Sequence, residues 1–173
     1  MENQANSKSI ILNYGLYLGL AGIFVNLIKY AMGALYTQEF YSAILGIVFL
    51  ILFIILGIKK YRSDNGGLIS FGQSVKIGIG ISMISAILTI IYLYLLANVI
   101  EPEFMQNTIE ANKVMLADSF GMTEGQIEEA TANSEDNFYL NMFGGVIIMS
   151  LFLGGIISLI AGAIMKKSEE DQY

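Results

Sequence analysis

The chain has 173 residues, a formal charge of −6, 55% hydrophobic residues and a mean hydropathy of +0.62. Only 14% of its residues are charged, and it contains no His, Cys or Trp. These absences exclude imidazole acid–base catalysis, thiolate nucleophiles, disulfides and the usual structural zinc sites. The apolar residues form four long blocks, so we expect an all-α integral membrane protein rather than a soluble domain.

Each block is long enough to cross about 30 Å of hydrocarbon at a rise of about 1.5 Å per residue. The four predicted transmembrane helices span residues 10–33, 41–58, 75–100 and 139–165, and the whole chain 1–173 forms one membrane domain. A cleaved signal peptide is the alternative interpretation of the first block. That block is longer than the about 7–15 apolar residues of a signal sequence, which favours a retained helix.

The first span carries small and polar residues on one helix face, because they follow each other in steps of three and four. These residues are Gly15, Gly19, Gly22, Asn26, Lys29 and Gly33. Small residues let helices approach closely in lipid, where association depends on van der Waals contact, and we interpret the glycines as helix-packing residues. The alternative interpretation is a polar path along Asn13, Asn26 and Lys29.

The second span has an apolar centre with small residues only near its ends, so we expect it to face lipid most fully. After it, Asn65-Gly66-Gly67 is a strong turn signal. Ser70 and Gln73 have capping-box spacing, which predicts that the third helix begins near Phe71.

Small residues return at helical spacing in the last two spans. The residues that we expect to pack are Gly78 and Ser82 in the third span, and Ser150, Gly154, Ser158 and Gly162 in the fourth. We therefore predict that the first, third and fourth helices form a tight core.

The basic residues predict the orientation of the helices. Seven flank the N-terminus, the second connection and the C-terminus, namely Lys8, Lys59, Lys60, Arg62, Lys76, Lys166 and Lys167. Only Lys29 and Lys113 lie on the other side, so the positive-inside rule places both termini in the cytoplasm. The predicted external side then sums to −8 and the cytoplasmic side to +2.

The connection 101–138 is the only sizeable segment outside the predicted spans, and we expect it to form a short extracytoplasmic helical hairpin. Apolar residues recur along one side of 103–120, including Phe104, Ile109, Met115 and Phe120. Gly121 is a helix stop signal, and Thr123 with Gln126 predicts a second capped helix. The apolar side is either a lid over the protein's own helix ends or a face for a partner protein.

Little catalytic chemistry is available in the sequence. No Asp or Glu lies inside the four blocks, and intramembrane carboxylates or His usually carry proton and cation transport. The sequence lacks a phosphate-binding loop and a nucleophile elbow, and its one basic patch is small. We predict no enzyme activity, no cofactor, no metal and no nucleic-acid partner; a homo-oligomer stays open.

The run Gly66-Gly67-Leu68-Ile69-Ser70-Phe71-Gly72-Gln73 after Lys59-Lys60-Tyr61-Arg62 resembles the bacterial membrane-protein family called domain of unknown function 4199. Pro102, the segment Gly121-Met122-Thr123-Glu124 and the ending Ser158 to Lys167 are similar to it too. The resemblance implies a four-span protein of the bacterial inner membrane, and it implies no catalytic residues.

Two functions follow as hypotheses. The first is a non-enzymatic accessory or assembly partner in the cell envelope, which would bind an envelope protein through the hairpin. The second is a small transporter or channel with a polar path along the Asn26 and Lys29 face of the first helix.

Overall fold

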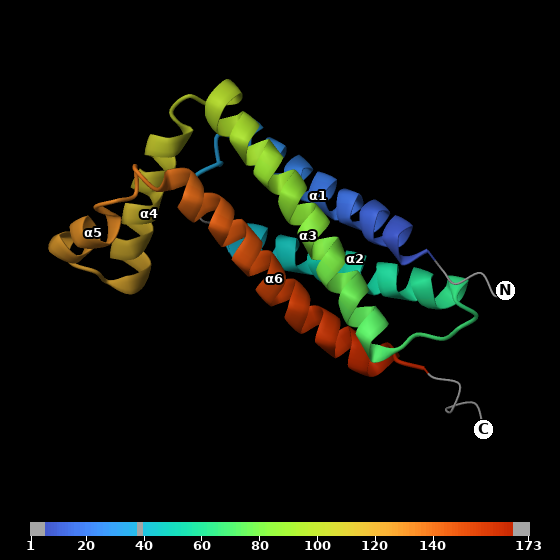
Figure 1. The fold of residues 1–173 in the computed structure, drawn as a ribbon. Coiled ribbons are helices and arrows are strands. Elements are labelled where there is room, and N and C mark those ends of the chain that lie inside the picture. Colours follow the sequence, from blue (N-terminus) through green and yellow to red (C-terminus); the bar gives the residue numbers. More distant parts are fainter. Residues whose placement is uncertain (1–5, 38–39, 168–173) are drawn as a thin grey trace.

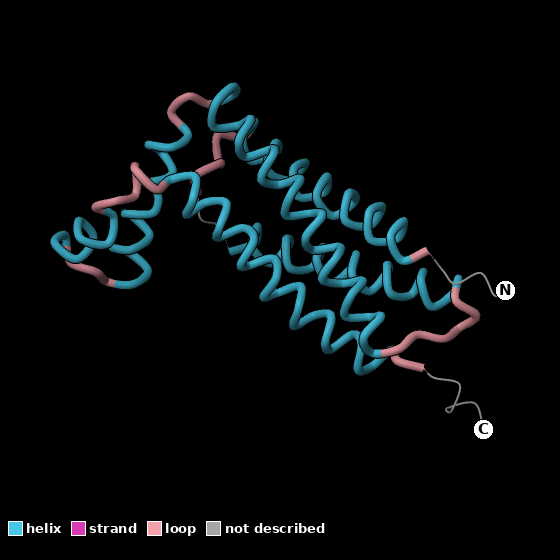
Figure 2. Tube along the Cα trace, viewed as in Figure 1, coloured by secondary structure: helices cyan, strands magenta, loops and turns pink. Residues whose placement is uncertain are grey.

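The structure, a computed structural model, describes residues 6–37 and 40–167, and this part of the chain is almost entirely helical (Figures 1 and 2). Its helices are α1 (Ser7–Ala31), α2 (Phe40–Asp64), α3 (Phe71–Leu95), the π-helical turn η1 (Leu96–Ile100), α4 (Phe104–Phe120), α5 (Glu124–Thr131) and α6 (Phe138–Met165). Four of these segments are long and apolar enough to cross a membrane: α1, α2, α3 with η1, and α6. The four predicted spans are thus confirmed as helices, and the chain is a multi-pass membrane protein.

The helix ends follow local signals. The α3 helix begins at Phe71 as predicted, because the Ser70 amide donates to Gln73 Oε1 (2.8 Å) and the Gln73 amide donates to Ser70 Oγ (3.2 Å). The predicted end of the second span at 58 is too early, since α2 continues to Asp64. Lys60 forms a salt bridge with Asp64, four residues later in the helix, at 2.8 Å. The chain reversal that contains Gly66 and Gly67, both with positive φ, follows this pair.

We expect Ser70→Ala to lower the free energy of unfolding by about 1 kcal/mol, the usual cost of losing an N-cap. The exposed Ser63, which caps no helix, is the matched control, and Ser63→Ala is expected to change stability by less than about 0.5 kcal/mol. Thermal unfolding of both variants in detergent checks this. Equal melting temperatures for the two variants would contradict it.

The tightest interface joins α3 and α6, which run antiparallel with small residues interlocked. Successive turns pair Ser74 with Gly162, Gly78 with Ser158, and Ser82 with Gly154. A Cβ added at Gly78 would lie 2.8 Å from Ser158 Cβ, and one at Gly154 would lie 2.6 Å from Ser82 Cβ. The two helices therefore approach as closely as these glycines permit.

The buried hydroxyls of this interface are satisfied within their own helices. Ser82 Oγ donates to the Gly78 carbonyl oxygen at 3.0 Å, and Ser158 Oγ donates to the Gly154 carbonyl oxygen. Such back-bonding leaves the serine side chains to act as small packing groups. Their burial therefore needs no hydrogen bond between the two helices.

The α1 and α3 helices run parallel, and glycines on both sides bring them together. On α1, Gly15 contacts Ile84 of α3 and Gly19 contacts Leu88 of α3. On α3, Gly80 contacts the side chain of Ile11 of α1. Gly22, one turn further along α1, has nothing within 4 Å of an added Cβ. Close contact between α1 and α3 at the glycines thus ends before Gly22.

The α2 helix is the least buried of the four spans: 17% of its most apolar window is buried, against 22–28% for the others. The expectation that it faces lipid most fully is therefore confirmed for the helix as a whole. One face nevertheless packs on α3, where Ile54 contacts Gly78 and Gly57 receives Ile81. Ile54 and Ile58 are completely buried there.

The first described residues of α1 and the last of α6 lie at one end of the bundle, and α4 and α5 lie at the other (Figure 1). We call the second end the hairpin end. At the first end, a short backbone bridge joins Ile69 and Lys167, and Arg62 Nε donates to the Gly67 carbonyl oxygen at 2.9 Å. The bridge ties the α2–α3 turn to the end of α6, and the Arg62 bond closes the turn itself.

Candidate functional site

An apolar cluster fixes α4 to the bundle at the hairpin end. It consists of Tyr92, Leu96, Phe104, Ile109 and Phe138, all of them buried. The rings of Phe104 and Phe138 meet edge to face with their centroids 6.2 Å apart. This cluster joins η1, the start of α4 and the start of α6 into one unit.

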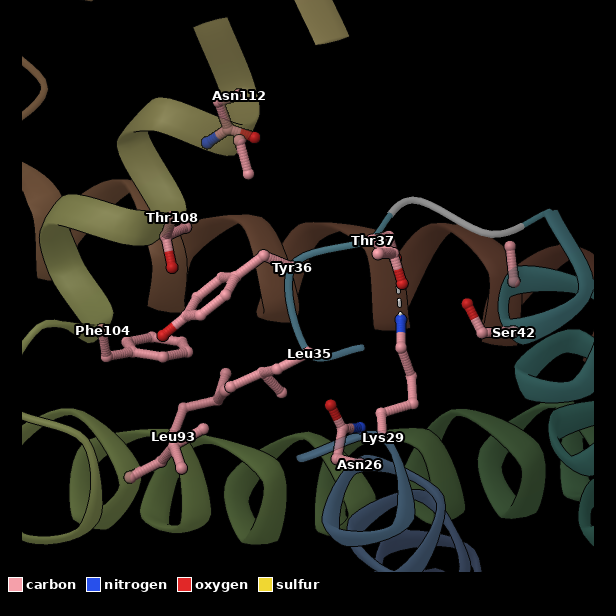
Figure 3. A pocket seen from close by; sticks show the side chains of 13 residues that line it. Asn26, Lys29, Leu35, Tyr36, Thr37, Ser42, Leu93, Phe104, Thr108 and Asn112 are labelled. Carbon is pink, nitrogen blue, oxygen red and sulfur yellow. Dashed lines mark hydrogen bonds between the residues drawn. The ribbon is translucent and has the colours of Figure 1, made fainter. Parts of the chain in front are cut away.

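Beside this cluster lies the main pocket of the hairpin end, with a volume of about 520 Å³. Its lining comes from α1, the α1–α2 connection, α2, α3, η1 and α4 (Figure 3). Leu35, Leu93 and Phe104 supply apolar walls, whereas Lys29 is the only charged side chain among the lining residues that the structure describes. A mostly apolar chamber with a few polar groups is the usual form of a ligand site.

Lys29 and Asn26 both line this pocket. Lys29 Nζ donates to the Thr37 carbonyl oxygen at 3.0 Å, and Asn26 Nδ2 donates to the Gly22 carbonyl oxygen at 3.1 Å (Figure 3). Lys29 forms no salt bridge with any described residue. No carboxylate of the described residues therefore pairs with its ammonium group at the pocket.

Asn13, the third residue of the predicted polar path, lies elsewhere. It is exposed, it contacts Ser9 Oγ at 3.5 Å, and it lines neither pocket that contains Asn26 and Lys29. Between Asn13 and Asn26 the same helix buries Gly15, Leu18 and Gly19. The structure thus brings Asn26 and Lys29 together and leaves Asn13 apart.

Two hydroxyl groups in the pocket wall lack hydrogen-bond partners among the described residues. They belong to Tyr36, in the α1–α2 connection, and Thr108, on α4, and both oxygen atoms are buried. Burial raises the pKa of Tyr36 above its ordinary value by more than the nearby Asn107 side chain lowers it. The Tyr36 hydroxyl is therefore a protonated donor at neutral pH. Helical periodicity gives no signal for either residue, because only the tertiary fold brings them together.

The predicted partner face of α4 is buried in its first half and exposed in its second half. Phe104 and Ile109 are buried against the bundle, Met115 is half-buried, and Phe120 is 68% exposed. Gly121 ends α4 in the left-handed conformation (φ 62°), as the sequence predicted. The first half of the face thus covers the helix ends, and the second half points away from them.

The predicted helix-packing residues fall into two groups, those that contact a neighbouring helix and one that lines a cavity. Six of them meet a neighbouring helix closely: Gly15, Gly19, Gly78, Gly154, Ser158 and Gly162. Ser82 faces Gly154, as described above, and Ser150 is half-buried one turn before Gly154 on α6. Gly22 instead lines a smaller pocket between α1 and α2.

The described residues contain no group of three or more His, Cys, Asp or Glu that could hold a metal ion. Among known proteins, a family model described as "Protein of unknown function (DUF4199)" matches residues 13–167. The comparisons with curated proteins and with solved structures gave no match.

Proposed function

We propose that this chain, which belongs to the DUF4199 family, is a non-enzymatic accessory or assembly protein of the bacterial inner membrane. In this proposal the hairpin end binds a partner protein of the cell envelope. The observation that supports it is the division of the α4 face. Phe104 and Ile109 already complete the bundle, yet α4 and α5 continue beyond them and expose Val114 and Phe120.

The charge of the hairpin indicates the chemistry of the partner. Residues 101–137 contain nine carboxylates and a single basic residue, Lys113, so their net charge is −8. None of these nine carboxylates forms a salt bridge with a described residue. A basic surface with an apolar centre is the complement of such an acidic, partly apolar unit.

The proposed orientation has both termini in the cytoplasm and the hairpin outside. It rests on the seven-to-two distribution of Lys and Arg between the two ends of the helices. The bundle would then anchor the acidic unit at the outer surface of the membrane.

The alternative function, a small transporter or channel, is supported by the pocket at Asn26 and Lys29. It is the weaker proposal, because Asn13 lies apart and buried packing residues separate it from the pocket. Solute flux in proteoliposomes that falls for Lys29→Leu, with unchanged melting temperature, would favour transport over the accessory role.

The accessory role is tested by a photo-crosslinking amino acid placed at Phe120, with Ile164 as the control position. Both side chains are highly exposed, but Ile164 lies on α6 at the other end of the bundle. We expect one protein adduct of defined mass at Phe120 and none at Ile164. Glu128→Lys with Glu129→Lys should lower its yield severalfold, because the reversed charges repel a basic partner. Absence of a protein adduct at Phe120, or a yield insensitive to charge reversal, would contradict the proposal.

A further inference from the structure

A second cavity lies between α1 and α2, next to the pocket at the hairpin end. It has a volume of about 240 Å³ and shares Asn26, Lys29, Ser42 and Ala43 with that pocket. Its other lining residues in the described part of the chain are Gly22, Val25, Gly46 and Phe49, which are all apolar or lack a side chain. A chamber that contains Lys29 and an apolar groove therefore adjoin each other at these shared residues.

Two glycines line the groove. A Cβ added at Gly22 of α1 or at Gly46 of α2 would meet nothing within 4 Å. Gly15 and Gly154, by contrast, are filled by a neighbouring helix, whereas Gly145 and Gly155 of α6 are as open as Gly22 and Gly46. Gly22 and Gly46 differ from these two in lining a cavity between α1 and α2, where a hydrocarbon chain can lie.

The chamber offers donors and positive charge to an oxygen-rich anion. Among the described residues, Lys29 is the only charged side chain that lines either cavity, and it has no carboxylate partner there. The hydroxyl oxygens of Tyr36 and Thr108 are buried in the wall of the chamber, so Lys29 is the group that an anion can reach. An anionic ligand would neutralise the ammonium group and form a charge-assisted hydrogen bond with it.

We propose that this space binds one anionic phospholipid from the leaflet at the hairpin end. The phosphate contacts Lys29 Nζ, and one acyl chain lies in the groove between Gly22 and Gly46. Lys29 is two residues from the end of α1, so the charged group lies where lipid headgroups meet the hydrocarbon. The lipid would fix α1, α2 and α4 relative to one another. This site is separate from the protein-binding face on the distal part of the hairpin.

Native mass spectrometry of the protein released from nanodiscs tests the proposal. The nanodiscs contain phosphatidylcholine with a minor share of phosphatidylglycerol, and the measurement is the amount of phosphatidylglycerol that stays bound. We expect Lys29→Gln to lower this amount about fivefold, because one basic group near the membrane surface has an effect of that size. Lys113→Gln removes the same charge from α4 outside both cavities, and we expect it to leave the bound lipid unchanged.

Two further variants separate lipid binding from loss of folding. Gly46→Leu fills the groove without changing any charge, and we expect it to lower bound phosphatidylglycerol while the melting temperature is maintained. Tyr36→Phe removes only a hydroxyl that is buried in the chamber wall, and we expect it to leave both the bound lipid and the melting temperature unchanged.

Inorganic phosphate distinguishes a lipid site from a simple anion site. We expect millimolar phosphate in detergent to raise the melting temperature only slightly, because it gains nothing from the groove. Equal retention of phosphatidylglycerol by the wild type, Lys29→Gln and Gly46→Leu proteins would overturn the proposal. A strong effect of phosphate that depends on Lys29 but not on Gly46 would also overturn it, in favour of a soluble anion.

Discussion

Gly154→Leu is expected to abolish the folded bundle, whereas Gly155→Leu, one residue further along the same helix, is expected to leave it folded. A Cβ at Gly154 would lie 2.6 Å from Ser82 Cβ, while a Cβ at Gly155 meets nothing within 4 Å. Inserting even small groups into a packed core costs about 1–3 kcal/mol. A leucine adds more and must separate α3 from α6, whereas the whole stability of a domain is only about 5–15 kcal/mol.

Thermal unfolding in detergent, followed by size-exclusion chromatography, measures this difference. Gly154→Ala is expected to give an intermediate loss of stability, because its single methyl group already lies too close to Ser82. Ile51→Leu on the exposed face of α2 is expected to resemble the wild type. Equal melting temperatures for Gly154→Leu and Gly155→Leu would show that the α3–α6 contact does not hold the bundle together.

Phe104→Ala is expected to release α4 and α5 from the bundle while α3 and α6 stay packed. Phe104 is 6% exposed and contacts both Phe138 and Tyr36 through its ring. Removing a buried phenyl ring costs about 3–5 kcal/mol, and here the loss falls on the cluster that fixes the hairpin. Phe120→Ala is the matched control, because Phe120 lies at the other end of α4 and is 68% exposed.

Amide hydrogen exchange measured segment by segment separates the two effects. For Phe104→Ala we expect faster exchange over 104–131 and little change over 74–90, whereas Phe120→Ala should leave both segments unchanged. Equal exchange in Phe104→Ala and Phe120→Ala over 104–131 would contradict the role of the cluster. Faster exchange in both segments of Phe104→Ala would mean that hairpin and bundle unfold as one unit.

Local sequence signals predicted the helices and several of their ends correctly. The apolar blocks identify the four spans because a spanning helix must satisfy its backbone internally and bury about 20 apolar residues in lipid. Ser70 and Gly121 mark helix ends because a cap depends only on neighbouring residues. The end of α2 was misplaced, because Lys59 to Asp64 look like a polar connection but continue the helix as a basic last turn.

The sequence could not predict which parts of a helix face are covered. Gly15 and Gly22 belong to one periodic stripe, yet only Gly15 meets α3. Phe104 and Phe120 likewise share the apolar side of α4, but α4 leaves the bundle between them. Periodicity assigns a residue to a face, whereas contact depends on where two helices cross and diverge. For the same reason the sequence does not predict the pocket that Lys29, Tyr36 and Thr108 line, because these residues come from three separate segments.

In the proposed orientation the hairpin end, with its acidic unit and its Lys29 pocket, faces the outside of the cell. The chain contains no cysteine, so single cysteines introduced at Phe120 and at Ser63 report on the two ends of the bundle without background. Both positions are exposed in the structure. A membrane-impermeant maleimide should label Phe120→Cys in intact cells and Ser63→Cys only after permeabilisation. Labelling of Ser63→Cys in intact cells, with Phe120→Cys protected, would contradict the claim.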